Sequence, residues 1–313
     1  MKISYGAKKI LAGLFVTAII FTGLVNAKSV FADDSISDKL SQTKDDVTKL
    51  LKVQDDMTIP SGPKQKMEVD LRREIISNVI DIAQSQLSDV QNQISSSTLP
   101  EGDGWNNVQN YLLNTLSQDV SYYSDTKASL QNNQDMTPAD LKNFAKSLEA
   151  MKSNNIDKDV ARVNNVLAAI NVNSVLSVAD DRLSKVEIDI NKIYSNKLTQ
   201  NQTLKTLYDQ ASDSLKSAHQ YNNDANQAIL NLYTSTTTTS TDDFIAALKD
   251  KILSQKISSI QAQYPLTDTS TIKVTQDDLD LYVANTVSEA YGSIKAAYDI
   301  FINMSVNVKK YLQ

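Results

Sequence analysis

Aliphatic side chains recur in alternating steps of four and three residues through most of this 313-residue chain. Such stepping places one apolar stripe along an α-helix, as in a coiled-coil seam. Helix-breaking residues are rare, because only four glycines and five prolines follow position 32. A β-rich domain needs a turn roughly every 8–12 residues. The pattern therefore predicts an all-α fold.

Interruptions of the stripe predict where the helices begin and end. The sequence Thr137-Pro138-Ala139-Asp140 has a capping threonine, a proline at the first helical position and an acid at the third. We expect residues 153–155 to interrupt a helix, with one continuous helix as the alternative. The predicted stripes cover 36–57, 67–94, 105–130, 141–151, 156–193, 204–232, 244–260 and 279–311.

These helices predict an elongated, antiparallel up-and-down bundle of about seven or eight long amphipathic helices. Regular seams favour shallow crossing angles and coiled-coil-like packing. We expect one bundle domain over residues 33–313. The alternative is a sub-boundary at the Ser/Thr-rich run 234–241, which would separate a C-terminal helical hairpin.

The first 32 residues have the three parts of an export signal. Lysines open the segment, residues 10–25 carry no charge, and two small-residue exits follow, ending at Ala27 and Ala32. We expect cleavage after Ala32, because Asp33 then opens an acidic, helix-like chain. An uncleaved anchor is the alternative, although a spanning helix needs about 20 apolar residues. The segment predicts a secreted or extracytoplasmic protein.

The charge of the chain limits the kinds of partner it can bind, and its lack of cysteine limits what can stabilise its fold. Removal of residues 1–32 takes away four lysines and no acid, so the net charge falls from −6 to −10. A surface this acidic repels phosphate backbones, which argues against a nucleic-acid partner. The chain has no cysteine, so no disulfide supports the fold. Buried apolar area must supply the stability.

No catalytic, cofactor or metal site is predicted. The only histidine, His219, has no cysteine or second histidine to complete a zinc site, and we expect it at a solvated rim. The chain holds 31 Asp and 6 Glu, but no calcium-binding loop motif. Pairs of aspartates occur at 33–34, 45–46, 55–56, 180–181, 242–243 and 277–278. We expect the first and the last two pairs to begin helices, where the helix dipole favours negative charge.

Other candidates have structural interpretations as well. Glu101 and Asp103 could serve a glycosidase, but they lie two residues apart in a loop and need not face each other across a cleft. Aromatic residues Trp105, Tyr122 and Tyr123 could stack on a ligand, although helical spacing favours packing. Five polar residues interrupt the seams and could fix helix register or mark contact faces. They are Thr43, Gln54, Ser174, Asn222 and Thr286.

Three functions stay open on these grounds. The first is a secreted or cell-surface, non-enzymatic bundle that binds a protein partner or itself through helix faces. The second is a component of an α-helical pore-forming toxin, for which 166–170 and 172–178 are the best apolar reserve segments. The third is an extracytoplasmic enzyme whose site assembles only in the fold. Membrane contact is expected only through an uncleaved signal or a toxin-like transition.

Overall fold

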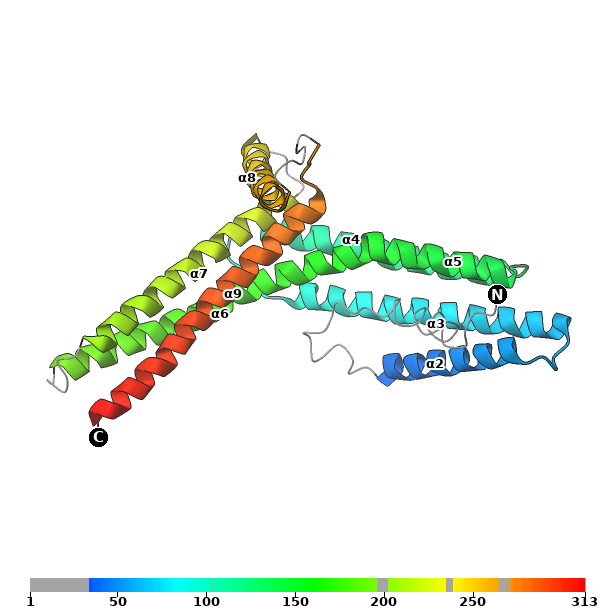
Figure 1. Ribbon diagram of the computed structural model, residues 1–313, viewed down its shortest axis with the longest axis horizontal. Helices are drawn as coiled ribbons and strands as arrows, with labels where there is room; N and C mark the ends of the chain where they lie inside the picture. Colours follow the sequence, from blue (N-terminus) through cyan, green and yellow to red (C-terminus); the bar gives the residue numbers. More distant parts are fainter. Residues whose placement is uncertain are drawn as a thin grey trace. The chain divides into compact units, whose positions relative to one another are not determined.

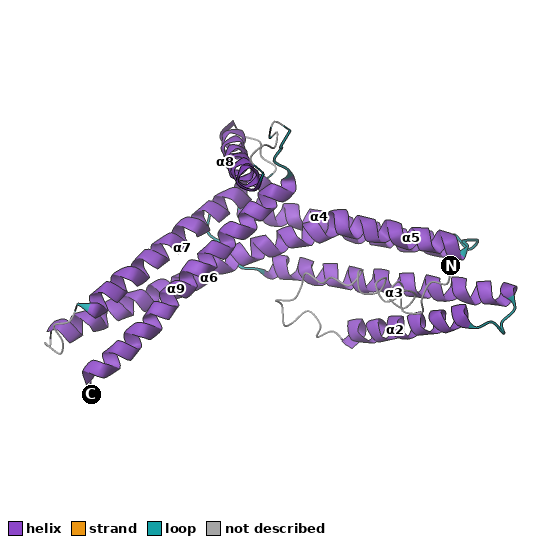
Figure 2. Ribbon diagram, in the orientation of Figure 1, coloured by secondary structure: helices purple, strands orange, loops and turns teal. Residues whose placement is uncertain are grey.

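The computed structural model describes residues 34–102, 104–195, 202–234, 239–264, 269 and 271–312. Every regular element in these residues is helical, which confirms the all-α prediction there (Figure 2). The predicted export signal, residues 1–32, lies outside the described residues. The helices are α2 (Asp34–Asp55), α3 (Ser61–Ser96), α4 (Trp105–Asn132), α5 (Pro138–Met151), α6 (Asp157–Ser195), α7 (Thr203–Tyr233), α8 (Thr239–Gln263) and α9 (Gln276–Leu312).

Contacts divide the chain into two compact units. The first unit takes in residues up to Ser96 together with Leu112–Val163, and the second takes in Ser97–Tyr111 together with Asn164–Gln313. Helices α4 and α6 each contribute residues to both units. The single domain over 33–313 stays a prediction. The Ser/Thr-rich run lies partly outside the described residues, and α8 begins within it at Thr239.

The first unit is built from antiparallel neighbours. Gln42 of α2 donates a hydrogen bond to Glu74 of α3, and Gln54 donates one to Glu68, so the two helices run in opposite directions. Arg73 of α3 donates to backbone carbonyls at the end of α4. The wide apolar stripe of α3 is buried from Ile76 to Ile94, as expected for a helix between neighbours.

Both predicted stripes in this hairpin run too far toward its turn. The predicted seam of α2 includes Met57, which is 97% exposed, and Met67 of α3 is also exposed. The buried stripe of α2 runs instead through Ile36, Thr43, Asp46, Leu50 and Val53. Helix α2 ends at Asp55, because Asp56 accepts hydrogen bonds from the backbone N–H and the hydroxyl of Thr58 in a turn.

Helices α5 and α6 are joined without a break. Residues Lys152–Ile156 form a single π-helical stretch, so the predicted interruption at 153–155 is wrong and the chain keeps its helical course. The Lys152 ammonium is buried and lies 2.7 Å from both carboxylate oxygens of Asp157, the first residue of α6. The alternative of one continuous helical path is therefore closer to the structure.

The predicted start of α5 is confirmed. Thr137 caps the helix, its hydroxyl accepts a hydrogen bond from the backbone N–H of Asp140, and the Asp140 carboxylate accepts one from the backbone N–H of Thr137. These two hydrogen bonds satisfy donors that the first helical turn leaves open. Hydrogen bonds from Thr137 also hold the pKa of Asp140 below its usual value.

Replacing Thr137 with alanine should lower the free energy of unfolding by about 1 kcal/mol, because a capping hydroxyl is lost. Urea denaturation followed by circular dichroism measures the change. Ser147→Ala on the same helix is the matched control, since its hydroxyl only donates to the carbonyl of Asn143 within the helix. Equal effects of the two substitutions would show that the cap contributes nothing.

The second unit is organised around α6, α7 and α9. Asn222 of α7 contacts Asn173 of α6, and His219 contacts Asp180, so these two helices are antiparallel. Tyr291 of α9 donates to the carbonyl of Ala168, and Asn165 donates to that of Asp280. Helix α9 therefore runs parallel to α6 and antiparallel to α7 (Figure 1).

Helix α8 departs from the predicted up-and-down arrangement. It runs across one end of α7 and α9 instead of along them (Figure 1). Lys256 of α8 pairs with Asp278 at the start of α9 at 2.8 Å. Among the side chains of α8 that the structure describes, the buried apolar ones are Leu248 and Ile252, so this helix has a small share in the core.

Candidate functional site

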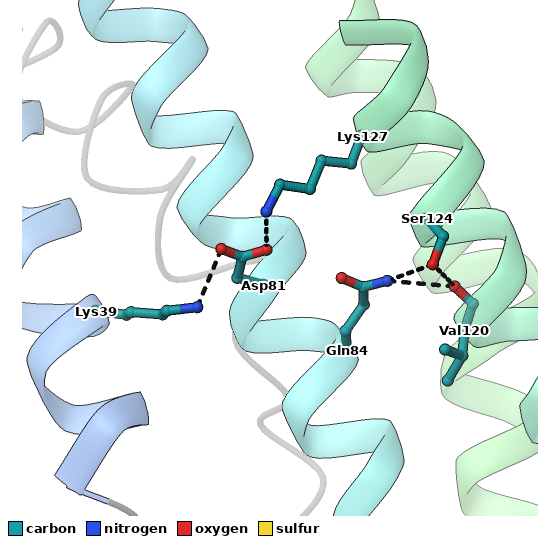
Figure 3. A network of polar contacts seen from close by, with 6 residues as sticks. All are labelled: Lys39, Asp81, Gln84, Val120, Ser124 and Lys127. Atoms are coloured by element: carbon teal, nitrogen blue, oxygen red, sulfur yellow. Dashed lines mark hydrogen bonds and ion pairs between the residues drawn. The ribbon is translucent and has the colours of Figure 1, made fainter. Parts of the chain in front are cut away.

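A polar network ties three helices of the first unit together (Figure 3). Asp81 of α3 lies between Lys39 of α2 and Lys127 of α4 and pairs with both, at 3.0 Å from Lys39. Gln84, one turn along α3, donates to the hydroxyl of Ser124 on α4 at 2.7 Å. Partial burial opposes the charged form of Asp81, but hydrogen bonds from Lys127 and Lys39 outweigh it and lower the pKa of Asp81.

A shallow depression of about 330 Å³ lies beside this network. Its walls are polar and it is open to solvent, so the paired carboxylate adjoins water instead of an enclosed cavity. General acid–base chemistry is favoured where a carboxyl group has its pKa moved toward neutrality. The pKa of Asp81 is shifted the opposite way, and its two ion pairs link α3 to α2 and to α4. The lining residues are Lys39, Asp81, Gln84, Ser85, Ser88 and Asp89.

Asp81→Asn should lower the free energy of unfolding at pH 7 by about 1 kcal/mol, because two partly exposed ion pairs are lost. The native pKa of Asp81 is depressed. Its contribution is therefore complete above the unfolded pKa near 4 and is lost as the pH falls through the native value. Urea denaturation at pH 7 and pH 3 measures this. Asp70→Asn, at an exposed position of α3, is the control and should change little.

A buried carboxyl group lies between α4 and α6 in the first unit. Asp119 is only 5% exposed, and its Oδ2 atom has no hydrogen-bond partner among the described residues. Burial raises the pKa of Asp119 to about 7, with a further contribution from the Asp159 charge and an opposing one from Arg162. The Tyr123 hydroxyl, one turn along α4, is also buried without a partner in the described part of the chain, and burial raises its pKa.

Asp119 is absent from the residues singled out in the sequence, although a signal for it exists. The predicted stripe of this helix includes Val120, but Val120 is only half-buried. The buried positions are Leu112, Leu116, Asp119 and Tyr123, which step by four, three and four residues. Strict stepping by four and three residues along α4 would therefore have placed Asp119, instead of Val120, on the buried seam. The charged groups near Asp119, which are Asp159 and Arg162, could not be read from the sequence, because they lie about 40 residues along the chain.

The predicted rim position of His219 is confirmed. Its side chain is about half exposed, and Nε2 lies 3.0 Å from Asp180 of the neighbouring helix. This pairing accounts for one acid of the 180–181 pair. Across the described residues, no group of three or more His, Asp or Glu side chains could hold a metal ion.

The aspartate pairs have several roles. Asp277 and Asp278 lie in the first turn of α9, as predicted. Hydrogen bonds from Lys256 and Thr275 lower the pKa of Asp278 to about 2. Asp46 is buried and pairs with Lys49, whereas Asp56 closes the turn after α2. Asp33 lies outside the described residues, as does Asp103 of the glycosidase hypothesis.

The aromatic candidates are packing residues. Trp105 and Tyr123 are buried, and Tyr122 packs edge-on against Tyr123 at 5.8 Å between ring centroids. The apolar segments 166–170 and 172–178, considered as a membrane reserve, are both continuous parts of α6. Their buried side chains in the second unit are Val166, Ala169, Ile170, Val172 and Leu176.

Polar residues in the seams divide into two groups. Thr43 and Thr286 are buried and donate to carbonyls of their own helices, and Asn222 donates to Asn173 Oδ1 at 2.7 Å. Asn222 is the one of these three that links neighbouring helices, as a register role requires. Gln54 and Ser174 are exposed.

Helix α9 has two different faces. Its inner face is buried in the second unit through Leu279, Val283, Ala290, Ile294, Ala297, Phe301 and Met304. Its outer face carries large apolar residues that are exposed: Leu281 is 57% exposed, Ile302 59% and Val306 50%. Tyr291, which is 36% exposed, lies at the edge of this face that adjoins α6, where its hydroxyl donates to the Ala168 carbonyl. At about 100° per residue, these four residues lie within about 80° of one another around the helix. We call them the outer stripe of α9.

Comparison with protein-family models, curated proteins and solved structures finds no match to this chain. A search of the described helices for a segment long and apolar enough to cross a membrane finds none. Function is therefore inferred from the helix surfaces themselves, and the outer stripe of α9 is the candidate functional site.

Proposed function

We propose that this chain is a non-enzymatic protein of the secreted or cell-surface compartment that binds other proteins through its helix faces. The observation that carries the proposal is the outer stripe of α9, where four large apolar side chains share one exposed arc. Scattered exposed apolar residues are normal on a protein surface, but aligned ones mark contact sites.

The chemistry of the stripe supports helix recognition. Protein partners that bind helices commonly use apolar anchors spaced three, four or seven residues apart. Ile302 and Val306 have this spacing, and Tyr291 adds an aromatic group of the kind enriched at interfaces. Ser288, Lys295 and Asp299 lie on the same arc, between Leu281 and Ile302, so the face alternates apolar and polar side chains along the helix.

Capture from secreted and surface fractions tests the proposal. The bait is the wild-type protein, compared with Ile302→Asp in the outer stripe and with Ile188→Asp, a matched exposed isoleucine on α6. We expect wild type and Ile188→Asp to retain the same proteins and Ile302→Asp to lose them. Identical retention by all three baits would overturn the assignment of binding to the outer stripe.

A second candidate function, a membrane-active bundle, is favoured by α8. Apolar residues occupy a wide arc of this helix, yet Phe244, Ile245 and Leu253 are only half-buried. A helix with apolar surface left partly uncovered can transfer to a lipid interface. Release of dye from liposomes by the purified protein would support this function, and intact liposomes at micromolar protein would remove it.

A further inference from the structure

We propose that the outer stripe of α9 binds the outer stripe of a second copy of this chain, with the two helices antiparallel across a two-fold axis. This inference rests on the proposed function, because it names the partner of the same surface. In a two-fold contact the same patch on each subunit must complement itself. An antiparallel register of α9 meets that condition.

The register is fixed by the apolar ends of the stripe. Leu281 of one copy lies opposite Val306 of the other, and by symmetry Val306 lies opposite Leu281. The same alignment places Ala284 beside Ile302 and Tyr291 beside Lys295 of the second copy. An ammonium next to an aromatic ring is a favourable contact. Apolar side chains therefore meet apolar ones, and the central lysine meets a tyrosine.

Charge complementarity selects the antiparallel orientation. The stripe is acidic at its start, where Asp277 is exposed, and basic at its end, where Lys309 is exposed. Both residues lie on the same arc of the helix as the four apolar side chains. In the register above, Asp277 of one copy comes within one turn of Lys309 of the other. A parallel pair would instead place like charges together, which costs binding energy.

The size of the contact sets the expected strength. Residues 281–306 cover about 37 Å of helix, at about 1.5 Å per residue. Two helix faces of this length bury an area at or below the low end of stable interfaces, which is about 1,200 Å². We therefore expect a dimer with a dissociation constant in the micromolar range.

Disulfide cross-linking tests the register directly, because the chain has no cysteine of its own. A disulfide needs Cα atoms within about 7 Å. Leu281→Cys mixed with Val306→Cys should give a covalent dimer under mild oxidation, whereas either variant alone should give little. In the antiparallel pair the two copies of position 281 are about 37 Å apart. Val178→Cys mixed with Val306→Cys is the control, since Val178 is exposed on α6 outside the stripe.

A charge exchange provides a second measurement on the non-covalent dimer. Lys309→Asp and Asp277→Lys should each weaken self-association about tenfold, because each change creates two repulsive contacts in a symmetric dimer. An equimolar mixture of the two variants should restore association, since the mixed dimer pairs opposite charges at both ends. Circular dichroism confirms that each variant is folded.

Efficient cross-linking of Leu281→Cys with itself would overturn the antiparallel register. The absence of cross-linking in the mixture, with a monomeric wild type at every concentration, would overturn self-association. The proposed function fails separately, when Ile302→Asp and the wild type capture the same proteins. A monomeric chain whose outer stripe still retains a different protein contradicts only the inference about a second copy.

Discussion

Replacement of Phe301 with alanine is expected to lower the free energy of unfolding by about 3–5 kcal/mol, the usual cost of removing a buried phenylalanine. Phe301 is 1% exposed on the inner face of α9. Its ring packs edge-on against Tyr298 at 5.6 Å, and the Arg182 guanidinium of α6 lies 5.6 Å from its centroid. Alanine removes these contacts and leaves a cavity. Urea denaturation of the purified variant measures the loss.

The adjacent residue supplies the control. Ile302 lies on the outer stripe, so Ile302→Ala should change the free energy of unfolding by less than about 0.5 kcal/mol. A helix that buries a single face places adjacent residues in different surroundings, so substitutions of Phe301 and Ile302 should differ in their effect on stability. Similar losses for both variants would contradict the division of α9 into an inner and an outer face, and the candidate site would lose its basis.

Asp119→Asn is expected to stabilise the protein at pH 8 by about 1–3 kcal/mol and to leave it unchanged at pH 4. The pKa of Asp119 is raised from 3.8 to about 7 in the native state. The protonated carboxyl of Asp119 stabilises the native state fully below about pH 4. Between about pH 4 and pH 7 the native state holds a proton that the unfolded state has released, so this stabilisation falls as the pH rises. Above about pH 7 it is gone. The full shift sets an upper limit of about 4 kcal/mol. Asparagine keeps the shape of the side chain and carries no charge.

Thermal denaturation between pH 4 and pH 8 measures this effect. Asp125→Asn is the matched control, because Asp125 lies on the same helix and is exposed. The stability gain from Asp119→Asn should grow between pH 4 and pH 7, whereas the control should show no such trend. A loss of stability at pH 8 would mean that Arg162 stabilises the ionised Asp119 more than burial destabilises it.

The helices could be predicted from the sequence because the information is local. Stripes stepping by four and three residues predict α7 and α9 closely, and the cap at Thr137 fixes the start of α5. The junction between α5 and α6 is harder to predict. Ser153 and the two asparagines that follow it favour a break, but the π-helical stretch Lys152–Ile156 keeps the helix continuous. Packing of Ile156 and pairing of Lys152 outweigh that local preference.

The arrangement of the helices depends on contacts that no local pattern contains. Apolar residues occupy a wide arc of α8, but no local pattern says which helices they contact, so its course across the ends of α7 and α9 could not be predicted. The outer stripe escapes prediction for a related reason. Stepping by four and three residues gives α9 a single seam, and Leu281, Tyr291 and Ile302 fall between its positions. Only the burial of the inner face shows that a second set of apolar residues stays in solvent.

Sedimentation of the purified protein across a concentration series tests most directly whether the outer stripe of α9 recognises a second copy. The wild type and Ile188→Asp should shift from monomer to twice the monomer mass as the concentration rises through the micromolar range. Ile302→Asp should stay monomeric over the same range. A wild type that remains monomeric throughout, or an Ile302→Asp variant that associates equally well, would contradict self-recognition through this stripe.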